Sequence, residues 1–158
     1  INGTFARPGV WVPVYYEYRS LSRIELLAYY RAADIALVTP LKDGMNLVAK
    51  EYCACSIEEN CVLILSEFAG AASQLARGAL LVNPHDIESV ADAINTACIM
   101  DPEERCTRMR RMRASIRDYD VFRWVDAFLH AAISKDLSAF PRPQGLSAEP
   151  VLEFQDPY

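Results

Sequence analysis

Short apolar runs separated by helical segments constrain the fold of this chain most strongly. Each run has four or five residues and is almost continuously apolar, as in strands buried on both faces: Asp34–Val38, Cys61–Leu65 and Ala79–Val82. The β-branched and aromatic residues of Val12–Tyr16 predict a fourth strand. Strands that alternate with helices predict an α/β fold, with a parallel sheet flanked by helices on both faces.

Helix start signals precede most of the expected helices. Ser22 and Glu25 have the spacing of a capping box, which predicts a helix that ends near Ala33. Asp86 can cap a further helix, and Asp101 another, whose first turn holds a proline and two acids. The remaining helices are expected at Asn46–Ser56 and Val121–Ser134, with a short helical piece after the small-residue loop at 69–72.

Length and composition limit the class of protein. The chain has 158 residues, enough for one domain, which we place at residues 1–135; a proline-rich tail or linker follows at 136–158. A net charge of −5 argues against a partner nucleic acid. No apolar run is long enough to cross a membrane. The chain opens with Ile1 rather than Met, which suggests a piece of a longer protein.

The cysteines and histidines do not indicate a metal site. Five cysteines lack the C-x-x-C spacing, and most lie in apolar patterns, which predicts buried free thiols in a reducing compartment, the cytoplasm. The two histidines, His85 and His130, lie far apart and have no neighbouring ligands. These residues therefore predict no metal site.

The segment after the first buried strand predicts an anion site. Val38 ends the strand, Asp43 and Gly44 form a turn, and a helix starts near Met45 or Asn46. The first N–H groups of such a helix have no intrahelical acceptor, and the helix dipole adds positive charge, so the tip suits a phosphate. Gly44 would permit a positive φ and a close approach of the ligand.

Glu51 lies one helical turn beyond Leu47 on the same face. Its carboxylate could accept hydrogen bonds from two adjacent hydroxyls of a ribose, as acids do in dinucleotide-binding folds. A phosphate at the tip and a ribose beside Glu51 would together be a nucleotide diphosphate. The simpler alternatives stay open: Asp43 and Gly44 form an ordinary turn, Asn46 is only a helix cap, and Glu51 belongs to a solvated face.

The sequence resembles one enzyme family closely. The stretch LVTPLKDGMNLVAKEY at 37–52 is similar to the signature of the trehalose-6-phosphate synthase family of glycosyltransferases. The stretches YYRAADIALVTP, LSEFAGAASQL and LVNPHD resemble its flanking blocks, and the likeness covers roughly residues 1–135. It implies a Rossmann-like domain, the C-terminal, nucleotide-sugar-binding half of a GT-B enzyme.

The resemblance also implies the reaction and its residues. The parent enzyme would transfer glucose from UDP-glucose to a sugar phosphate acceptor, glucose 6-phosphate, with retention at the anomeric carbon and without a metal or other cofactor. Carried over by position, Asp43 through Asn46 would contact the glucose, and Glu51 would hold the ribose. The backbone N–H groups of Asn46, Leu47 and Val48 would bind the diphosphate, and the backbone at Leu21 would read the uracil.

The rest of such an enzyme would come from an N-terminal Rossmann domain of the same protein. The family's basic pair, which clamps the diphosphate, and its acceptor residues lie upstream of this sequence, so the chain alone would hold half a site. Phe122, Trp124 and Phe128 would contact the partner domain or pack in the core. Gln74 stands where the family often has an acid; the alternatives are the loss of a carboxylate near the cleft and a surface change, and we expect the surface change.

Two alternatives to this function remain. One is a related glycosyltransferase that uses the same donor with another acceptor, such as glycerol phosphate or a pseudo-sugar. The other is a non-catalytic regulatory homologue, which the intact block from Asp43 to Glu51 disfavours.

Overall fold

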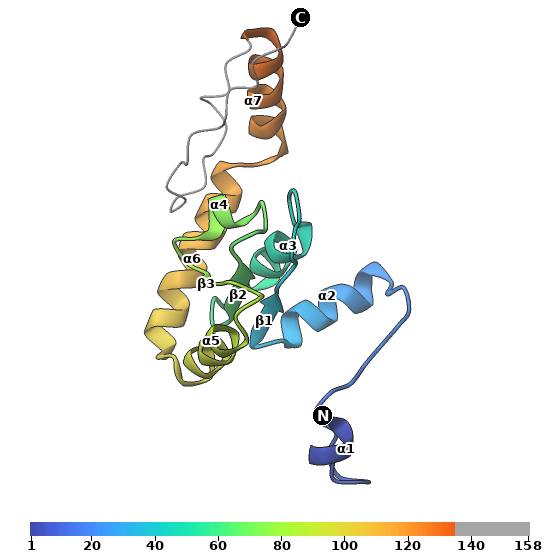
Figure 1. Ribbon diagram of the computed structural model, residues 1–158. Helices are drawn as coiled ribbons and strands as arrows, with labels where there is room; N and C mark the ends of the chain where they lie inside the picture. Colours follow the sequence, from blue (N-terminus) through green and yellow to red (C-terminus); the bar gives the residue numbers. More distant parts are fainter. Residues whose placement is uncertain (135–158) are drawn as a thin grey trace, which may run out of the picture.

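The computed structural model describes residues 1–134, so the tail expected at 136–158 lies outside the described part of the chain. A small three-stranded sheet lies at the centre, and helices surround it (Figure 1). The elements in chain order are α1 (Asn2–Phe5), α2 (Arg23–Ala32), β1 (Ile35–Val38), α3 (Leu47–Cys55), β2 (Val62–Ser66), α4 (Ala72–Leu75), β3 (Leu80–Val82), α5 (Ile87–Ile99), α6 (Pro102–Asp118) and α7 (Val121–Ser134).

The sheet is parallel, with the strand order β1-β2-β3. All five residues of β2 are buried, and its side chains alternate between two apolar clusters. Leu63 and Leu65 pack with residues of α2, α3, α4 and α6, whereas Val62 and Ile64 pack with Ala97 of α5. Because both faces of the sheet are covered, the expected α/β fold with flanking helices is confirmed.

The helix starts follow the sequence signals. The Ser22 side chain accepts a hydrogen bond from the N–H of Glu25, and the Glu25 carboxylate accepts one from the N–H of Ser22. Asp86 caps α5 through the N–H of Ser89, and Asp101 caps α6 through its side chain. These short polar side chains satisfy N–H groups that the helices cannot, which fixes where each helix begins.

The strand expected at Val12–Tyr16 is wrong: this segment joins no sheet in the described structure. Pro13 has no N–H to donate to a ladder, and the Asn2 side chain binds both the N–H and the carbonyl of Val14, at 2.9 and 2.7 Å. Tyr15 and Tyr16 are about four-fifths exposed, so these aromatic side chains do not belong to the core of this chain.

The cysteines are only partly as expected. None of the five is in a disulfide, and Cys53 and Cys61 are buried. Cys98 is exposed on α5, so burial of its thiol is wrong. Burial strongly raises the pKa of the Cys53 thiol, which lies 3.9 Å from the sulfur of Met112 in the core. Over residues 1–134, no helix is both long and apolar enough to span a bilayer.

The backbone of the loop after β2 passes very close to the loop after β1. A Cβ atom at Gly70 would overlap the carbonyl group of Gly44, whereas a Cβ atom at Gly44 would meet nothing within 4 Å. Only a residue without a side chain therefore fits at position 70.

We predict that Gly70→Ala lowers the free energy of unfolding by about 3 kcal/mol, because the loops must separate to admit the methyl group. The matched change Gly44→Ala should cost less than about 0.5 kcal/mol, since its Cβ enters open space. Thermal melting of both variants checks this; equal losses would contradict the close-approach explanation.

Candidate functional site at the β1–α3 corner

The Asp43 carboxylate organises the turn between β1 and α3. One of its oxygens, Oδ1, accepts hydrogen bonds from the N–H groups of Met45 and Asn46, both at 3.1 Å. The other, Oδ2, accepts one from the Asn46 side-chain amide at 2.9 Å. The donated bonds, from the Asn46 side chain first and the Met45 N–H second, lower the pKa of the Asp43 carboxyl. The carboxylate thus faces the backbone of its own turn.

Asn46 carries the unusual backbone conformation of the corner. Its φ of 61° and ψ of 84° lie in the left-handed region, and its side chain accepts a hydrogen bond from the N–H of Ala49 at 2.9 Å. The interpretation of Asn46 as a helix cap is therefore confirmed. Gly44 does not use the positive φ that glycine permits; Asn46 makes the left-handed turn instead.

The loop after β2 holds the β1–α3 corner in place. The N–H of Gly70 donates to the carbonyl of Asp43 at 2.8 Å, and Asp43 forms an isolated parallel bridge with Ala69. The loops after β1 and β2 therefore meet beyond the carboxyl ends of their strands, the edge where open α/β sheets bind ligands.

The N-terminal tip of α3 is open. Asn46 satisfies the N–H of Ala49, and the helix offers no acceptor to the N–H groups of Leu47 and Val48. The side chains of Leu47 and Val48 are about half exposed, and the first turn contains no acid to offset the helix dipole. The tip therefore presents two N–H donors and partial positive charge to solvent.

Glu51 follows one turn later, with an exposed side chain. Its Oε2 accepts a hydrogen bond from the hydroxyl of Tyr30, on α2, at 3.0 Å. Sequence reasoning missed Tyr30, because it lies 21 residues before Glu51 and the packing of α2 on α3 brings the two together. Glu51 therefore follows the corner formed by Asp43 through Val48 on the same helix, and its binding role stays a prediction.

Leu21 comes from a different segment than the other predicted site residues. It is half-buried and immediately precedes Ser22, the cap of α2. Within the described part of the chain, no hydrogen bond joins it to the corner.

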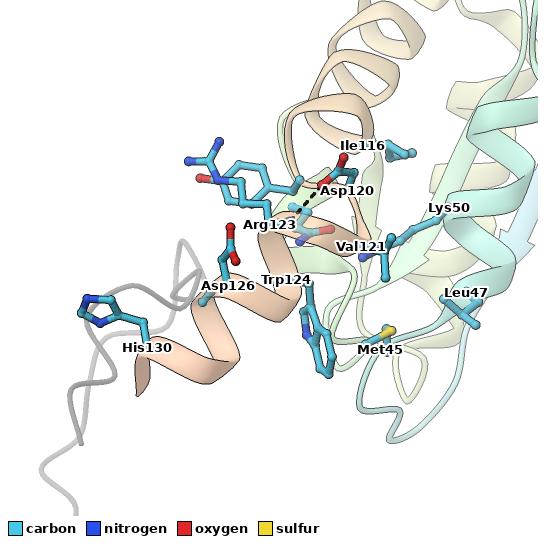
Figure 2. A pocket seen from close by; sticks show the side chains of 13 residues that line it. Met45, Leu47, Lys50, Ile116, Asp120, Val121, Arg123, Trp124, Asp126 and His130 are labelled. Atoms are coloured by element: carbon cyan, nitrogen blue, oxygen red, sulfur yellow. Dashed lines mark hydrogen bonds between the residues drawn. The ribbon is translucent and has the colours of Figure 1, made fainter. Parts of the chain in front are cut away.

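A cavity of about 820 Å³ adjoins the tip, between the start of α3 and the helices α6 and α7 (Figure 2). Gln74 lies in its wall, and its buried Oε1 has no hydrogen-bond partner among residues 1–134, so the expected surface change at Gln74 is wrong. Burial lowers the pKa of Lys50 in the same wall. The lining residues are Met45, Leu47, Lys50, Gln74, Ile116, Tyr119, Asp120, Val121, Arg123, Trp124, Asp126, Ala127 and His130.

Helix α7 projects away from the sheet (Figure 1). The rings of Trp124 and Phe128 stack on each other, with centroids 5.5 Å apart, and both side chains are about half exposed. Phe122 is 75% exposed. These aromatic residues do not form a core within residues 1–134. In the same range, no group of three or more His, Cys, Asp or Glu side chains could hold a metal ion.

Comparison with known proteins identifies the family. The sequence model of glycosyltransferase family 20 matches residues 1–134. The chain belongs to glycosyltransferase family 20. This family-20 chain is 50% identical, over 141 residues, to a trehalose-6-phosphate synthase of Mycobacterium sp. (strain KMS). It is 51% identical, over 136 residues, to that of Mycolicibacterium vanbaalenii.

Solved structures of family relatives have the same fold. An E. coli protein bound with UDP-2-fluoro glucose matches with a TM-score of 0.76 and 42% identity, over 89% of this chain and 30% of the other. The UDP-forming trehalose-phosphate synthase of Burkholderia xenovorans, in complex with glucose-6-phosphate, matches with a TM-score of 0.77 and 45% identity, over 82% and 28%. The alignment with the Mycobacterium relative covers 89% of this family-20 chain but only 28% of that relative. It thus spans less than a third of these proteins.

We predict that the turn loses its hydrogen bonds in acid. The lowered pKa of Asp43 means that the carboxylate stabilises the fold above the ordinary value of 3.8, and that this contribution disappears as the pH falls through the folded-state pKa. Amide exchange at Met45 and Asn46 should accelerate over that range. In Asp43→Ala the exchange should be fast already at neutral pH, because alanine has no side-chain acceptor for either N–H group.

The matched control is Asp92→Ala, which removes an exposed carboxylate on α5. It should leave both amides protected at neutral pH and preserve the acid transition. Retained protection in Asp43→Ala would show that the carboxylate does not hold the turn.

Proposed function

We propose that this chain is the donor-binding part of a UDP-forming trehalose-6-phosphate synthase, which transfers glucose from UDP-glucose to glucose 6-phosphate with retention of configuration. The observation that carries the proposal is the open tip of α3, held by Asp43 and followed one turn later by Glu51. The relatives named trehalose-6-phosphate synthase, and the solved structures with UDP-2-fluoro glucose and glucose-6-phosphate, support this choice of donor and acceptor.

In this proposal, different residues bind different parts of UDP-glucose. The N–H groups of Leu47 and Val48 bind the diphosphate, whereas the N–H of Asn46 is engaged by Asp43. The glucose lies against the turn from Asp43 to Asn46, and Glu51 accepts hydrogen bonds from the ribose hydroxyls. The backbone at Leu21 contacts the uracil.

The chemistry of this part is electrostatic. When the bond between glucose and UDP breaks, negative charge accumulates on the departing diphosphate. N–H groups that are already oriented interact more strongly with this charge than with the intact donor, so they favour the transition state. The chain's own contribution is to bind, orient and stabilise the leaving group, and a nucleophilic side chain at the corner has no part in it.

An N-terminal Rossmann domain supplies the rest of the site in this proposal. The exposed aromatic face of α7 is a suitable surface for contact with it, because Trp124 and Phe128 find no core within the described residues. The five cysteines without disulfides are consistent with a reducing, cytoplasmic environment.

We predict that Glu51→Ala weakens binding of UDP to the full-length protein by about tenfold, the loss expected for hydrogen bonds to a charged group. Isothermal titration calorimetry measures this. The matched control is Glu58→Ala, since Glu58 is an exposed carboxylate just beyond α3, paired with Arg31. Affinity for UDP that does not change in Glu51→Ala would contradict the ribose role.

The half-site predicts a clear difference between the chain and the whole protein. The 158-residue chain alone should bind UDP weakly and form no trehalose 6-phosphate, because it lacks the second half of the cleft. The full-length protein should release UDP from UDP-glucose only with a sugar phosphate acceptor. An assay of UDP release with glucose 6-phosphate and with glycerol phosphate identifies the acceptor, and rapid transfer by the chain alone would disprove the half-site.

A further inference from the structure

The hydroxyl of Tyr30 is a donor fixed in place by the core. Tyr30 is only 9% exposed, and its ring meets that of Tyr52 edge to face, with centroids 6.4 Å apart. The Tyr52 hydroxyl in turn donates to the backbone carbonyls of Ala33 and Val62, at 3.0 and 3.3 Å. The Tyr30 ring therefore packs against a residue that is itself anchored to the sheet.

The acceptor of this hydroxyl is an exposed carboxylate. Tyr30 Oη lies 3.0 Å from Oε2 of Glu51. One donated bond uses one of the roughly four acceptor positions of a carboxylate, which leaves Oε1 and part of Oε2 for a ligand. An exposed glutamate without such a bond samples several rotamers, and binding a ligand then costs the entropy of selecting one.

We propose that Tyr30 is a positioning residue for the nucleotide: its hydroxyl holds the Glu51 carboxylate in the rotamer that receives the vicinal hydroxyls of the donor's ribose. This inference rests on the role of Glu51 in the proposed function. Burial, and then the bond to Glu51, raise the pKa of the Tyr30 hydroxyl to about 12, so it keeps its proton at neutral pH.

The test compares Tyr30→Phe with the unchanged full-length protein. Phenylalanine keeps the buried ring, and water can replace the lost bond at the exposed Glu51. Calorimetry with UDP and with 2′-deoxy-UDP measures the preference for ribose. We expect Tyr30→Phe to lower this preference about three- to tenfold, and to raise KM for UDP-glucose by a similar factor with kcat nearly unchanged.

Tyr29→Phe is the matched control. Tyr29 is the neighbouring residue on α2, and its hydroxyl donates to another carboxylate, that of Glu17, at 3.2 Å. The Tyr29→Phe variant should leave the preference for UDP over 2′-deoxy-UDP unchanged. A melting curve for each variant verifies that the fold is intact.

Glu51→Ala separates failure of this inference from failure of the proposed function. If Glu51→Ala does not lower the ribose preference, the proposed role of Glu51 is wrong, and the positioning role of Tyr30 falls with it. If Glu51→Ala lowers it but Tyr30→Phe does not, only the role of Tyr30 is overturned. Equal loss of affinity for both nucleotides in Tyr30→Phe would also overturn it. The double variant should lose no more ribose preference than Glu51→Ala alone.

Discussion

The complete burial of β2 is the constraint on which the rest of the structure depends. Leu63 and Leu65 require a helical layer on one face, and Val62 and Ile64 require another layer on the opposite face. Crossover helices can supply these layers only if the strands run parallel, and parallel strands place their following loops at one edge. The close approach of the two loops at Gly70 follows from this geometry, and the hydrogen bond from Gly70 to Asp43 keeps them together.

At that edge, side chains of the turn accept hydrogen bonds from several of its own N–H groups. The Asp43 carboxylate accepts hydrogen bonds from the N–H groups of Met45 and Asn46, and the Asn46 side chain accepts one from the N–H of Ala49. The donors of Leu47 and Val48 remain at the tip of α3. A ligand therefore meets a small set of donors in fixed positions, which is the condition under which backbone dipoles stabilise developing charge without reorganisation.

The sequence predicted most of the fold because local signals and burial agreed. Capping side chains such as Ser22 and Asp86 mark helix starts by local hydrogen bonds, and the apolar runs of β1, β2 and β3 need cover on both sides. The segment Val12–Tyr16 failed because composition suits an exposed apolar surface as well as a strand, and Pro13 should have lowered that expectation. Asp43 and Glu51 could be found from their places around a helix tip, whereas Tyr30 could not, because its distance from Glu51 depends on how α2 packs against α3.

The opposite charges at the corner explain how such a site could distinguish its ligand. The tip of α3 attracts any anion, but the Glu51 carboxylate one turn away repels it. Inorganic phosphate would gain from the tip and lose to Glu51, because it has no pair of vicinal hydroxyls to donate to the carboxylate. In the proposed function, a nucleotide diphosphate places its charge at the tip and its hydroxyls at Glu51, so the same carboxylate becomes an attraction. Specificity is a difference between the affinities for two ligands. A carboxylate that repels one ligand and accepts hydrogen bonds from the other increases that difference. If Glu51 is held in one rotamer, the nucleotide loses less conformational entropy when its hydroxyls bind the carboxylate. The repulsion between Glu51 and a bare phosphate is unchanged.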